Sequence, residues 1–235
     1  MSGKSATARR ETTPSTRQRI VHAARKLMQA EGTSFSMRGL AEQAGVSIAT
    51  PYNLFKSKDG IISAVVDEDL RHLQKALLEI EAGPIDAFFK IIDVTAELFG
   101  EAPVLYKAGA RLVGSQADAA THEKRQRSFH QPRFLVLKAL VAQAVQDGAI
   151  LHKVNLDSFT IHIGQQMLSW ILVWGNDRIE LEEMRLRTNY AVAVALSGVA
   201  TDSTRAELLE RAFRYQDELQ KIEKRLLAQT GKQAK

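Results

Sequence analysis

The sequence predicts an all-α protein in which a small three-helix unit with a helix-turn-helix layout is joined by a long helix to a larger helical bundle. Apolar residues recur at helical spacing along nearly the whole chain, and no stretch alternates convincingly like a half-buried strand. Residues 36–58 have the order of a helix, a glycine-marked turn and a second short helix. The 235 residues leave ample material beyond this unit for a second, larger core.

The first helix is expected to run from Ser15 to Glu31, with Gly32 ending it. Its inward side chains are Ile20, Ala24, Leu27 and Met28. Phe35, in the loop that follows, can fill the small core.

The helix-turn-helix pattern lies in the segment SMRGLAEQAGVSIATPYNLFKSK, residues 36–58. Gly45 stands where the chain must reverse, because a residue without Cβ costs least there. Ser47 is expected to cap the second helix, in which Tyr52 and Phe55 lie three residues apart and so share one side. The other side then carries small or hydrogen-bonding residues: Ile48, Ala49, Thr50 and Asn53. Such a face can enter a DNA major groove.

Pro51 lies inside this second helix, where a proline usually removes a hydrogen bond and costs about 3 kcal/mol. If the helix begins at Ser47 or Ile48, Pro51 falls in the first turn, where amides have at most their first intrahelical partner, and the cost is much smaller. We therefore expect a locally rigid helix. The alternative is that Pro51 breaks it.

A long helix is expected to begin at Lys58 and Asp59, to hold an apolar period as far as Ile80, and to end near Gly83 and Pro84. The helices expected beyond it cover residues 85–99, 103–114, 121–147 with a kink or split at Pro132, 155 or 157 to 174, 180–199 and 204–229.

The chain divides by pattern into a flexible basic arm (1–14), the helix-turn-helix domain (15–62), a connecting helix (63–83), a large C-terminal domain (84–229) and a disordered tail (230–235). The first 30 residues hold seven Lys or Arg and one Glu, a net +6, whereas the whole chain carries +5. The basic excess is therefore entirely N-terminal. Attraction to DNA phosphates explains it, and so does a solubilising arm.

The run from Thr16 to about Lys75 resembles the N-terminal domain of TetR-family transcriptional regulators. The family pattern LA..AGVS...Y..F.SK..L appears in register as Leu40, Ala41, Ala44, Gly45, Val46, Ser47, Tyr52, Phe55, Ser57, Lys58 and Ile61. Pro51 departs from it, since the family more often carries Leu or Ile there. The resemblance implies a repressor that binds a near-palindromic double-stranded DNA operator as a homodimer and is released by a small-molecule inducer.

On this resemblance the phosphate backbone is contacted by Tyr52 and Lys58, with Ser36 and Arg38 as further anchors; hydroxyls, a lysine and helix N-termini suit an anionic oxygen. The Tyr52 ring can alternatively serve packing alone. Base discrimination falls to the outward face of the second helix. The full predicted DNA-binding set is Ser36, Arg38, Ser47, Ile48, Ala49, Thr50, Tyr52, Asn53 and Lys58.

Two later runs, Phe159 to Trp174 and Tyr190 to Val199, are apolar almost all the way around, so each helix is buried on more than one side. A single bundle could bury both, and a second subunit is the other possible cover. The resemblance implies a dimeric four-helix interface, to which we assign Ile171, Trp174, Tyr190, Val194 and Leu196. The final helix extends past the end of many family members and leaves open which helices pair.

The resemblance also implies an inducer pocket whose occupation shifts the long helix. The candidate ligand-binding residues form an aromatic-rich set suited to an apolar ligand: Phe88, Phe89, Ile92, Phe99, Leu105, Phe134, Met167 and Trp170. Each of them also fits an ordinary core position.

Other function classes find little support. The sequence lacks GxSxG, HExxH and a glycine-rich phosphate loop, and its histidines are scattered, so no enzyme, cofactor or metal site is expected. It has no cysteine, no signal-peptide core and no apolar run that could span a bilayer, which predicts a soluble, cytoplasmic protein with no membrane partner. The alternatives to a ligand-released repressor are an activator and an architectural DNA-binding protein without an inducer.

Overall fold

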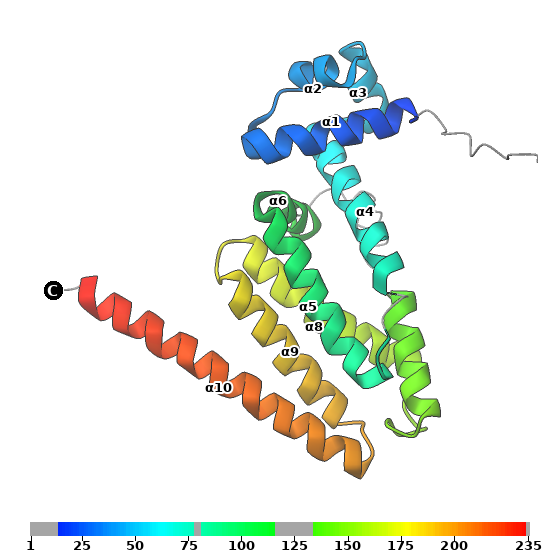
Figure 1. Cartoon of the computed structure of the whole chain (residues 1–235), viewed down its shortest axis with the longest axis vertical. Coiled ribbons are helices and arrows are strands. Elements are labelled where there is room, and N and C mark those ends of the chain that lie inside the picture. The colour runs from blue at the N-terminus through cyan, green and yellow to red at the C-terminus, as the bar shows by residue number, and fades with distance from the viewer. Residues whose placement is uncertain (1–13, 78–80, 116–133, 234–235) are drawn as a thin grey trace, which may run out of the picture. The chain divides into compact units, whose positions relative to one another are not determined.

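The computed structural model describes residues 14–77, 81–115 and 134–233, and every named element in these ranges is a helix (Figure 1). The predicted all-α fold is thus confirmed. Several sequence predictions fall partly or wholly outside the described residues: the basic arm, the end of the connecting helix near Ile80, the start of the helix expected at 121–147 with its kink or split at Pro132, and the end of the tail. The last helix continues to Gln233, so the prediction of a disordered tail from residue 230 is wrong as far as the structure describes it.

The chain forms two compact units, Met1–Val65 and Val66–Lys235. The N-terminal unit contains α1 (Thr16–Glu31), the short 3-10 helix η1 (Gly32–Ser34), α2 (Met37–Ala44), α3 (Ala49–Phe55) and the first part of α4 (Lys58–Leu77). The C-terminal unit contains the rest of α4, then α5 (Pro84–Glu101), α6 (Pro103–Gly114), a helix described over residues 134–146, α8 (Leu156–Gly175), α9 (Leu181–Ser197) and α10 (Asp202–Gln233).

Local sequence signals account for several helix ends. Ser15 and Gln18 form a capping box at the start of α1, in which Ser15 Oγ accepts from the Gln18 amide and the Gln18 side chain accepts from the Ser15 amide. Asn155 caps α8 by accepting from the Ser158 amide at 2.9 Å. Both α5 and α6 begin with proline, whose missing amide would have no intrahelical partner there.

The core of the N-terminal unit is formed by apolar side chains from α1, α2, α3 and the start of α4, together with Phe35. Phe35 is 1% exposed, which confirms the expectation that it fills this small core. The other fully or nearly buried side chains include Ile20, Ala24, Met28, Leu40, Ala41, Phe55, Ile61 and Val65.

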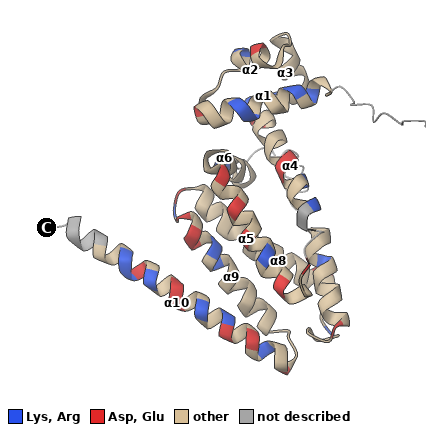
Figure 2. Ribbon diagram, viewed as in Figure 1, with Lys and Arg blue, Asp and Glu red and all other residues tan. Residues whose placement is uncertain are grey.

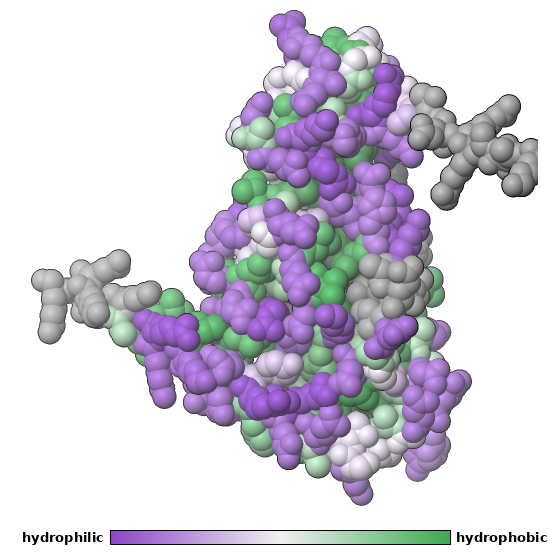
Figure 3. Space-filling view, viewed as in Figure 1, coloured by the Kyte–Doolittle hydropathy of each residue, from purple (hydrophilic) through white to green (hydrophobic). Residues whose placement is uncertain are grey.

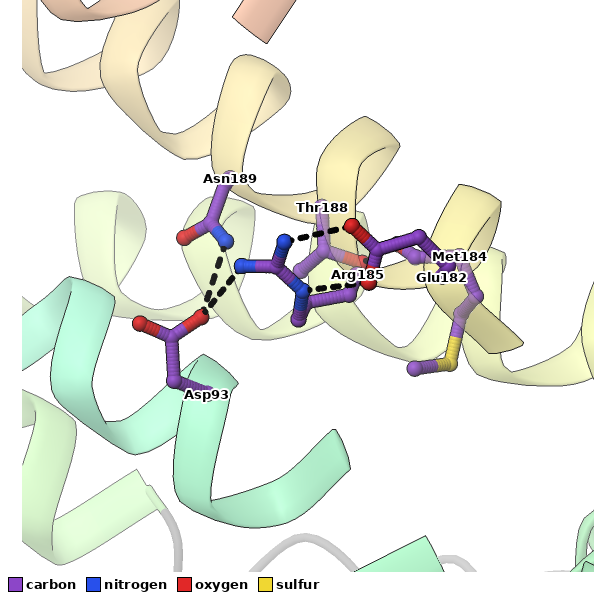
Figure 4. A network of polar contacts seen from close by, with 6 residues as sticks. All are labelled: Asp93, Glu182, Met184, Arg185, Thr188 and Asn189. Carbon is purple, nitrogen blue, oxygen red and sulfur yellow. Dashed lines mark hydrogen bonds and ion pairs between the residues drawn. The ribbon is translucent and has the colours of Figure 1, made fainter. Parts of the chain in front are cut away.

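Within the C-terminal unit, α5 and α9 are joined by a polar network (Figure 4). Arg185 donates to Asp93 of α5 at 3.0 Å and to both carboxylate oxygens of Glu182 at 2.6 and 2.8 Å. Asn189, one helical turn along, donates to the same Asp93 oxygen at 3.3 Å. One carboxylate on α5 therefore orients two side chains of α9.

Helix α6 is linked to α4 on one side and to the end of α8 on the other. Tyr106 donates to Asp69 of α4 at 2.8 Å. Lys107 and Arg111 both pair with Asp177, in the turn after α8, and Arg111 also donates to the Gly175 carbonyl at 2.7 Å. The Phe99 ring stacks on Tyr106 at 4.8 Å and on Trp174 at 5.3 Å between centroids.

Candidate nucleic-acid interface

The turn between α2 and α3 has the geometry that its glycine predicts. Gly45 adopts a left-handed conformation, φ 64° and ψ 44°, which a residue with a Cβ adopts only at a cost. Its amide donates to carbonyls of α2, and the Val46 amide donates to Ala41 at 3.0 Å. At the other end of α2, Ser36 Oγ accepts from the Gly39 amide at 3.0 Å. These contacts hold a helix, a tight turn and a second helix in the predicted order.

The predicted cap of α3 is wrong by one position. Ile48 occupies the cap position, and no side chain caps the helix. Ser47 instead uses its hydroxyl to bond the Thr50 hydroxyl at 2.8 Å, while its backbone carbonyl accepts from the Thr50 amide at 2.9 Å. The Thr50 amide thus donates to the Ser47 backbone carbonyl, whereas a side-chain cap would have accepted this hydrogen bond with the Ser47 hydroxyl.

Pro51 is the third residue of α3 and is buried, so it lies in the first turn without breaking the helix. The inward face of α3 is formed by Pro51 and Phe55, which stand four residues apart. Tyr52 is rotated by about 100° from Pro51 and is 48% exposed. The prediction that Tyr52 shares the side of Phe55 is therefore wrong, because the proline takes the place on the inner face.

The nine predicted DNA-binding residues all reach the surface. Thr50 and Lys58 are half-buried, and the others are exposed: Ser36, Arg38, Ser47, Ile48, Ala49, Tyr52 and Asn53. Leu54 of α3 is also exposed, at 41%. Sequence reasoning passed over Leu54, since a leucine in a short amphipathic helix is usually read as core.

Two cations flank α3 and lie on aromatic rings of the core. The Arg17 guanidinium is 4.4 Å from the Phe55 ring centroid, and Arg17 also donates to the Leu54 carbonyl at 3.5 Å. Lys58 Nζ is 4.7 Å from the Phe35 ring centroid. A cation–π contact restricts the position of the charged group and leaves its positive charge unpaired by a carboxylate. The sequence marked Arg17 only as part of the basic N-terminus, and its packing partner is visible only in the fold.

The charge on these helices suits an anionic partner. Helix α1 holds four Lys or Arg and a single Glu, at its last position, and α3 has no charged residue (Figure 2). The hydroxyl pair of Ser47 and Thr50 keeps further hydrogen-bonding capacity, because each hydroxyl can donate once and accept twice. The surface therefore offers cations beside α3 and polar groups on it.

Residues 20–65 match the family model of the bacterial regulatory proteins, tetR family. These residues carry the sequence pattern of that family's helix-turn-helix domain. Proteins of that family are bacterial regulators, and the matched residues include α2, the turn at Gly45 and α3.

Several solved structures resemble this chain over most of their own length. FadR of Thermus thermophilus, described as a transcriptional repressor in complex with lauroyl-CoA, is 16% identical with a TM-score of 0.66, covering 77% of this chain and 94% of that one. FadR of Bacillus subtilis, in complex with stearoyl-CoA, is 19% identical with a TM-score of 0.60, covering 77% and 98%. RolR in complex with resorcinol is 20% identical with a TM-score of 0.59, covering 84% and 92%. At these identities the likeness is one of fold.

No curated protein matches the sequence significantly.

In the C-terminal unit, the predicted ligand-binding residues fall into several environments. Phe88, Phe89, Ile92 and Met167 belong to one core cluster, and Leu105 and Phe99 are also buried. Phe134 is half-buried. Phe89 lines a cavity of about 440 Å³ between α5 and α10, together with Asp93, Arg211 and Tyr215. Trp170 lines a separate groove of about 530 Å³ between α8, α9 and α10.

The five predicted dimer residues fall into two groups, three in the core of the single chain and two at its surface. Ile171, Trp174 and Leu196 are 4%, 1% and 0% exposed within a single chain, so the chain's own helices cover them. A second chain can reach Tyr190 and Val194, which line the groove. Helix α8 is thus buried by its own bundle along one face, whereas Ile161 on another face is 49% exposed.

None of the helices in the described ranges combines the length and apolar character needed to span a bilayer. Within those same ranges, no group of three or more His, Asp or Glu side chains is arranged to hold a metal ion.

Proposed function

We propose that this TetR-family regulator is a cytoplasmic repressor that binds a near-palindromic operator as a homodimer and is released by a small, largely apolar ligand. The observation that carries the proposal is the exposed face of α3, held by the buried pair Pro51 and Phe55, within a segment that matches the family model. A helix fixed to its domain by two inward residues can present its remaining side chains to a groove at one orientation.

The side chains divide by chemistry into positioning and reading groups. Arg38, Lys58 and the hydroxyls of Ser36 and Tyr52 suit phosphate oxygens and fix the register on the duplex. Asn53 and Thr50 can hydrogen-bond base edges, and Ile48 and Ala49 can contact thymine methyl groups. The exposure of Tyr52 supports its assignment to DNA and weakens the alternative that its ring only packs.

A dimer follows from the size of the reading element. Helix α3 has seven residues and can contact only a few base pairs, so one chain would discriminate weakly among genomic sites. Two copies related by a twofold axis read two half-sites about 34 to 36 Å apart, and the discriminating free energies add. Tyr190 and Val194 are the predicted interface residues that a second chain can touch.

The ligand proposal has support of another kind. Structural neighbours of this chain were solved in complex with lauroyl-CoA and stearoyl-CoA, which have long acyl chains, and with resorcinol, which has a benzene ring. The C-terminal unit has an aromatic-rich interior around Phe88, Phe89 and Phe99. Helix α4 runs from the helix-turn-helix unit into this bundle as one continuous helix, so it can carry a displacement between the two.

Selection of bound fragments from genomic DNA with the purified chain tests DNA recognition. We expect fragments that share an inverted repeat, protected with a stoichiometry of two chains per repeat. Recovery of fragments without a common sequence would contradict a sequence-specific operator and favour an architectural protein.

The selected operator then allows the ligand to be tested by linkage. A ligand that acts as an inducer raises the melting temperature of the free protein and lowers operator affinity through the same binding event. A metabolite screen by thermal shift, repeated with operator anisotropy, measures both quantities. Tight ligands that leave operator affinity unchanged would rule out release by ligand, and higher transcription on operator binding would indicate an activator.

A further inference from the structure

Helix α10 carries an apolar stripe, and the other helices of the bundle bury only its N-terminal part. The stripe alternates spacings of four and three residues through Leu208, Ala212, Tyr215, Leu219, Ile222 and Leu226. This is the heptad spacing of helices that pair along a seam. Burial falls along it: Leu208 is 1% exposed, Leu219 is 9% exposed, and Leu226 is 49% exposed.

Further apolar side chains beside the stripe are also exposed. Phe213 is 58% exposed and Leu227 is 73% exposed. Helix α10 has 32 residues and is about 48 Å long; it packs on α9, and its C-terminal end projects from the bundle (Figure 1). Apolar surface, green in Figure 3, interrupts the hydrophilic surface along this projecting part. An exposed apolar face on a regular heptad spacing indicates a protein contact surface.

The groove between α8, α9 and α10 lies at the base of this projection. Its apolar lining comes from Trp170, Tyr190, Ala191, Val194, Ala195 and Leu219. Trp170 Nε1 is buried and, among the described residues, has no hydrogen-bond partner. Arg187 and Glu223, 3.8 Å apart, stand beside the groove, with the guanidinium 5.1 Å from the Trp170 ring. The groove therefore combines an apolar floor with polar groups at its edge.

We propose that residues 213–228 of α10 form an arm that packs along the groove of a second copy of the chain, while the partner's arm does the same in return. The arm and the groove are on the same chain, so a twofold axis satisfies both at once, as an isologous contact requires. The proposal rests on the dimer of the proposed function. It adds the segment that holds the dimer together, and it is continuous with Tyr190 and Val194, which line the groove.

The charges of the arm favour a second copy over a lipid surface. Residues 213–228 hold four Lys or Arg and three Asp or Glu, and the two signs alternate along the helix (Figure 2). A helix that lies on a membrane needs a strongly basic polar face to attract anionic lipid. Nearly equal numbers of positive and negative side chains beside a heptad stripe are typical of helices that pair with another protein helix.

The decisive experiment compares two double variants with the same change of net charge. Leu226→Asp with Leu227→Asp adds two negative charges on the apolar face, whereas Lys221→Gln with Lys224→Gln removes two positive charges from the polar face. We expect sedimentation equilibrium to give a dimer dissociation constant raised at least about tenfold in the first variant and nearly unchanged in the second. Far-UV circular dichroism confirms that both variants stay helical.

A crosslinking experiment tests where the arm lies. The chain has no cysteine, so Leu227→Cys gives a single site for a benzophenone label. Labelled chain is mixed with isotopically heavy, unlabelled chain, and crosslinked peptides are identified by mass spectrometry. We expect crosslinks to α8 and α9 of the heavy chain. Crosslinks confined to the labelled chain itself would overturn the proposal.

The two proposals fail in different ways. A full-length chain that stays monomeric while it saturates its operator overturns the dimer of the proposed function. A stable dimer that is indifferent to Leu226→Asp with Leu227→Asp overturns the arm alone. Binding to anionic phosphatidylserine vesicles that the same variant abolishes, with no change in dimerisation, also overturns the arm and assigns the face to a membrane.

Discussion

The Tyr106 hydroxyl donates to Asp69 Oδ2 at 2.8 Å, and both side chains are more than nine-tenths buried. The bond joins α6 to the part of α4 that lies in the C-terminal unit. A hydrogen bond to a buried carboxylate is among the stronger side-chain contacts, because water cannot replace the lost donor. A movement of α6 would therefore be transmitted to α4 through this hydrogen bond.

Tyr106→Phe removes this donor and keeps the ring that stacks on Phe99. We expect a loss of about 1.5–3 kcal/mol in the free energy of unfolding, measured by urea titration. Tyr52→Phe is the matched control, since it deletes a hydroxyl from a ring that is 48% exposed, and its stability should stay within about 0.5 kcal/mol. Equal effects of the two variants would contradict a structural role for the Tyr106 bond.

Gly60 is required where the first turn of α4 passes the end of α3. A Cβ at this position would lie 2.1 Å from the Phe55 carbonyl oxygen, a backbone atom that cannot move aside cheaply. We expect Gly60→Ala to destabilise the N-terminal unit by about 2 kcal/mol or more and to weaken DNA binding.

Gly164→Ala is the control for that substitution and should have the opposite sign. Gly164 lies inside α8, where the nearest atom to a new Cβ is 4.0 Å away. Alanine should then stabilise the helix by roughly 0.5–1 kcal/mol. Calorimetric melting of both variants checks the pair, and a harmless Gly60→Ala would show that the backbone there shifts freely.

Asp177 should make stability depend on pH in the acid range. Its hydrogen bond from Lys107, with further attraction from Lys107 and Arg111, holds the pKa of the Asp177 carboxyl below its usual value. A lowered folded-state pKa contributes stability above the unfolded-state pKa, about 3.9, and the contribution is lost as pH falls through the folded-state pKa.

Asp177→Asn is the matched variant, because asparagine also tolerates the positive φ of 56° found at this position. We expect the wild-type chain to melt higher than Asp177→Asn at pH 7 and the difference to disappear once the carboxyl is protonated. Added salt at pH 7 should narrow it as well. A difference that is constant from pH 7 to pH 3 would point to packing and away from charge.

DNA contacts should separate into two classes on the selected operator. Arg38→Ala and Lys58→Ala should weaken specific and random DNA alike and flatten the salt dependence of binding, since each removes a phosphate contact. Asn53→Ala should mainly reduce discrimination, by about 1–3 kcal/mol at one base pair. Fluorescence anisotropy across a salt series measures both, and binding unaffected by any of the three would show that α3 is not the reading helix.

Lys58→Ala has a second expected effect that Arg38→Ala lacks. Lys58 lies over the Phe35 ring at 4.7 Å, so its removal should also lower the stability of the N-terminal unit, by about 0.5–1 kcal/mol. Melting without DNA separates this loss from the loss of a phosphate contact.

The sequence by itself determined where the helices lie and how the helix-turn-helix is ordered. Ser15, Gly32, Ser36, Gly45 and Asn155 end or begin helices through bonds to residues only a few positions away, so their effect is written in the local sequence. The TetR resemblance adds the proposed DNA-reading face, because its motif also lies within one short segment. Turn glycines and most of these helix ends were accordingly predictable from the local sequence, whereas the inner face of α3 was not, because Pro51 occupies it in place of Tyr52.

Only the tertiary structure decided which apolar residues are covered and by what. Pro51 displaced Tyr52 from the inner face of α3, and Ile171, Trp174 and Leu196 proved to belong to their own chain's core. Asp93 meets Arg185 across 92 residues of sequence, and the groove forms where α8, α9 and α10 converge. Helical periodicity predicts that a face is buried, because an apolar face is driven out of water. It does not predict which helix packs against that face, because this depends on packing between segments that are distant in the sequence.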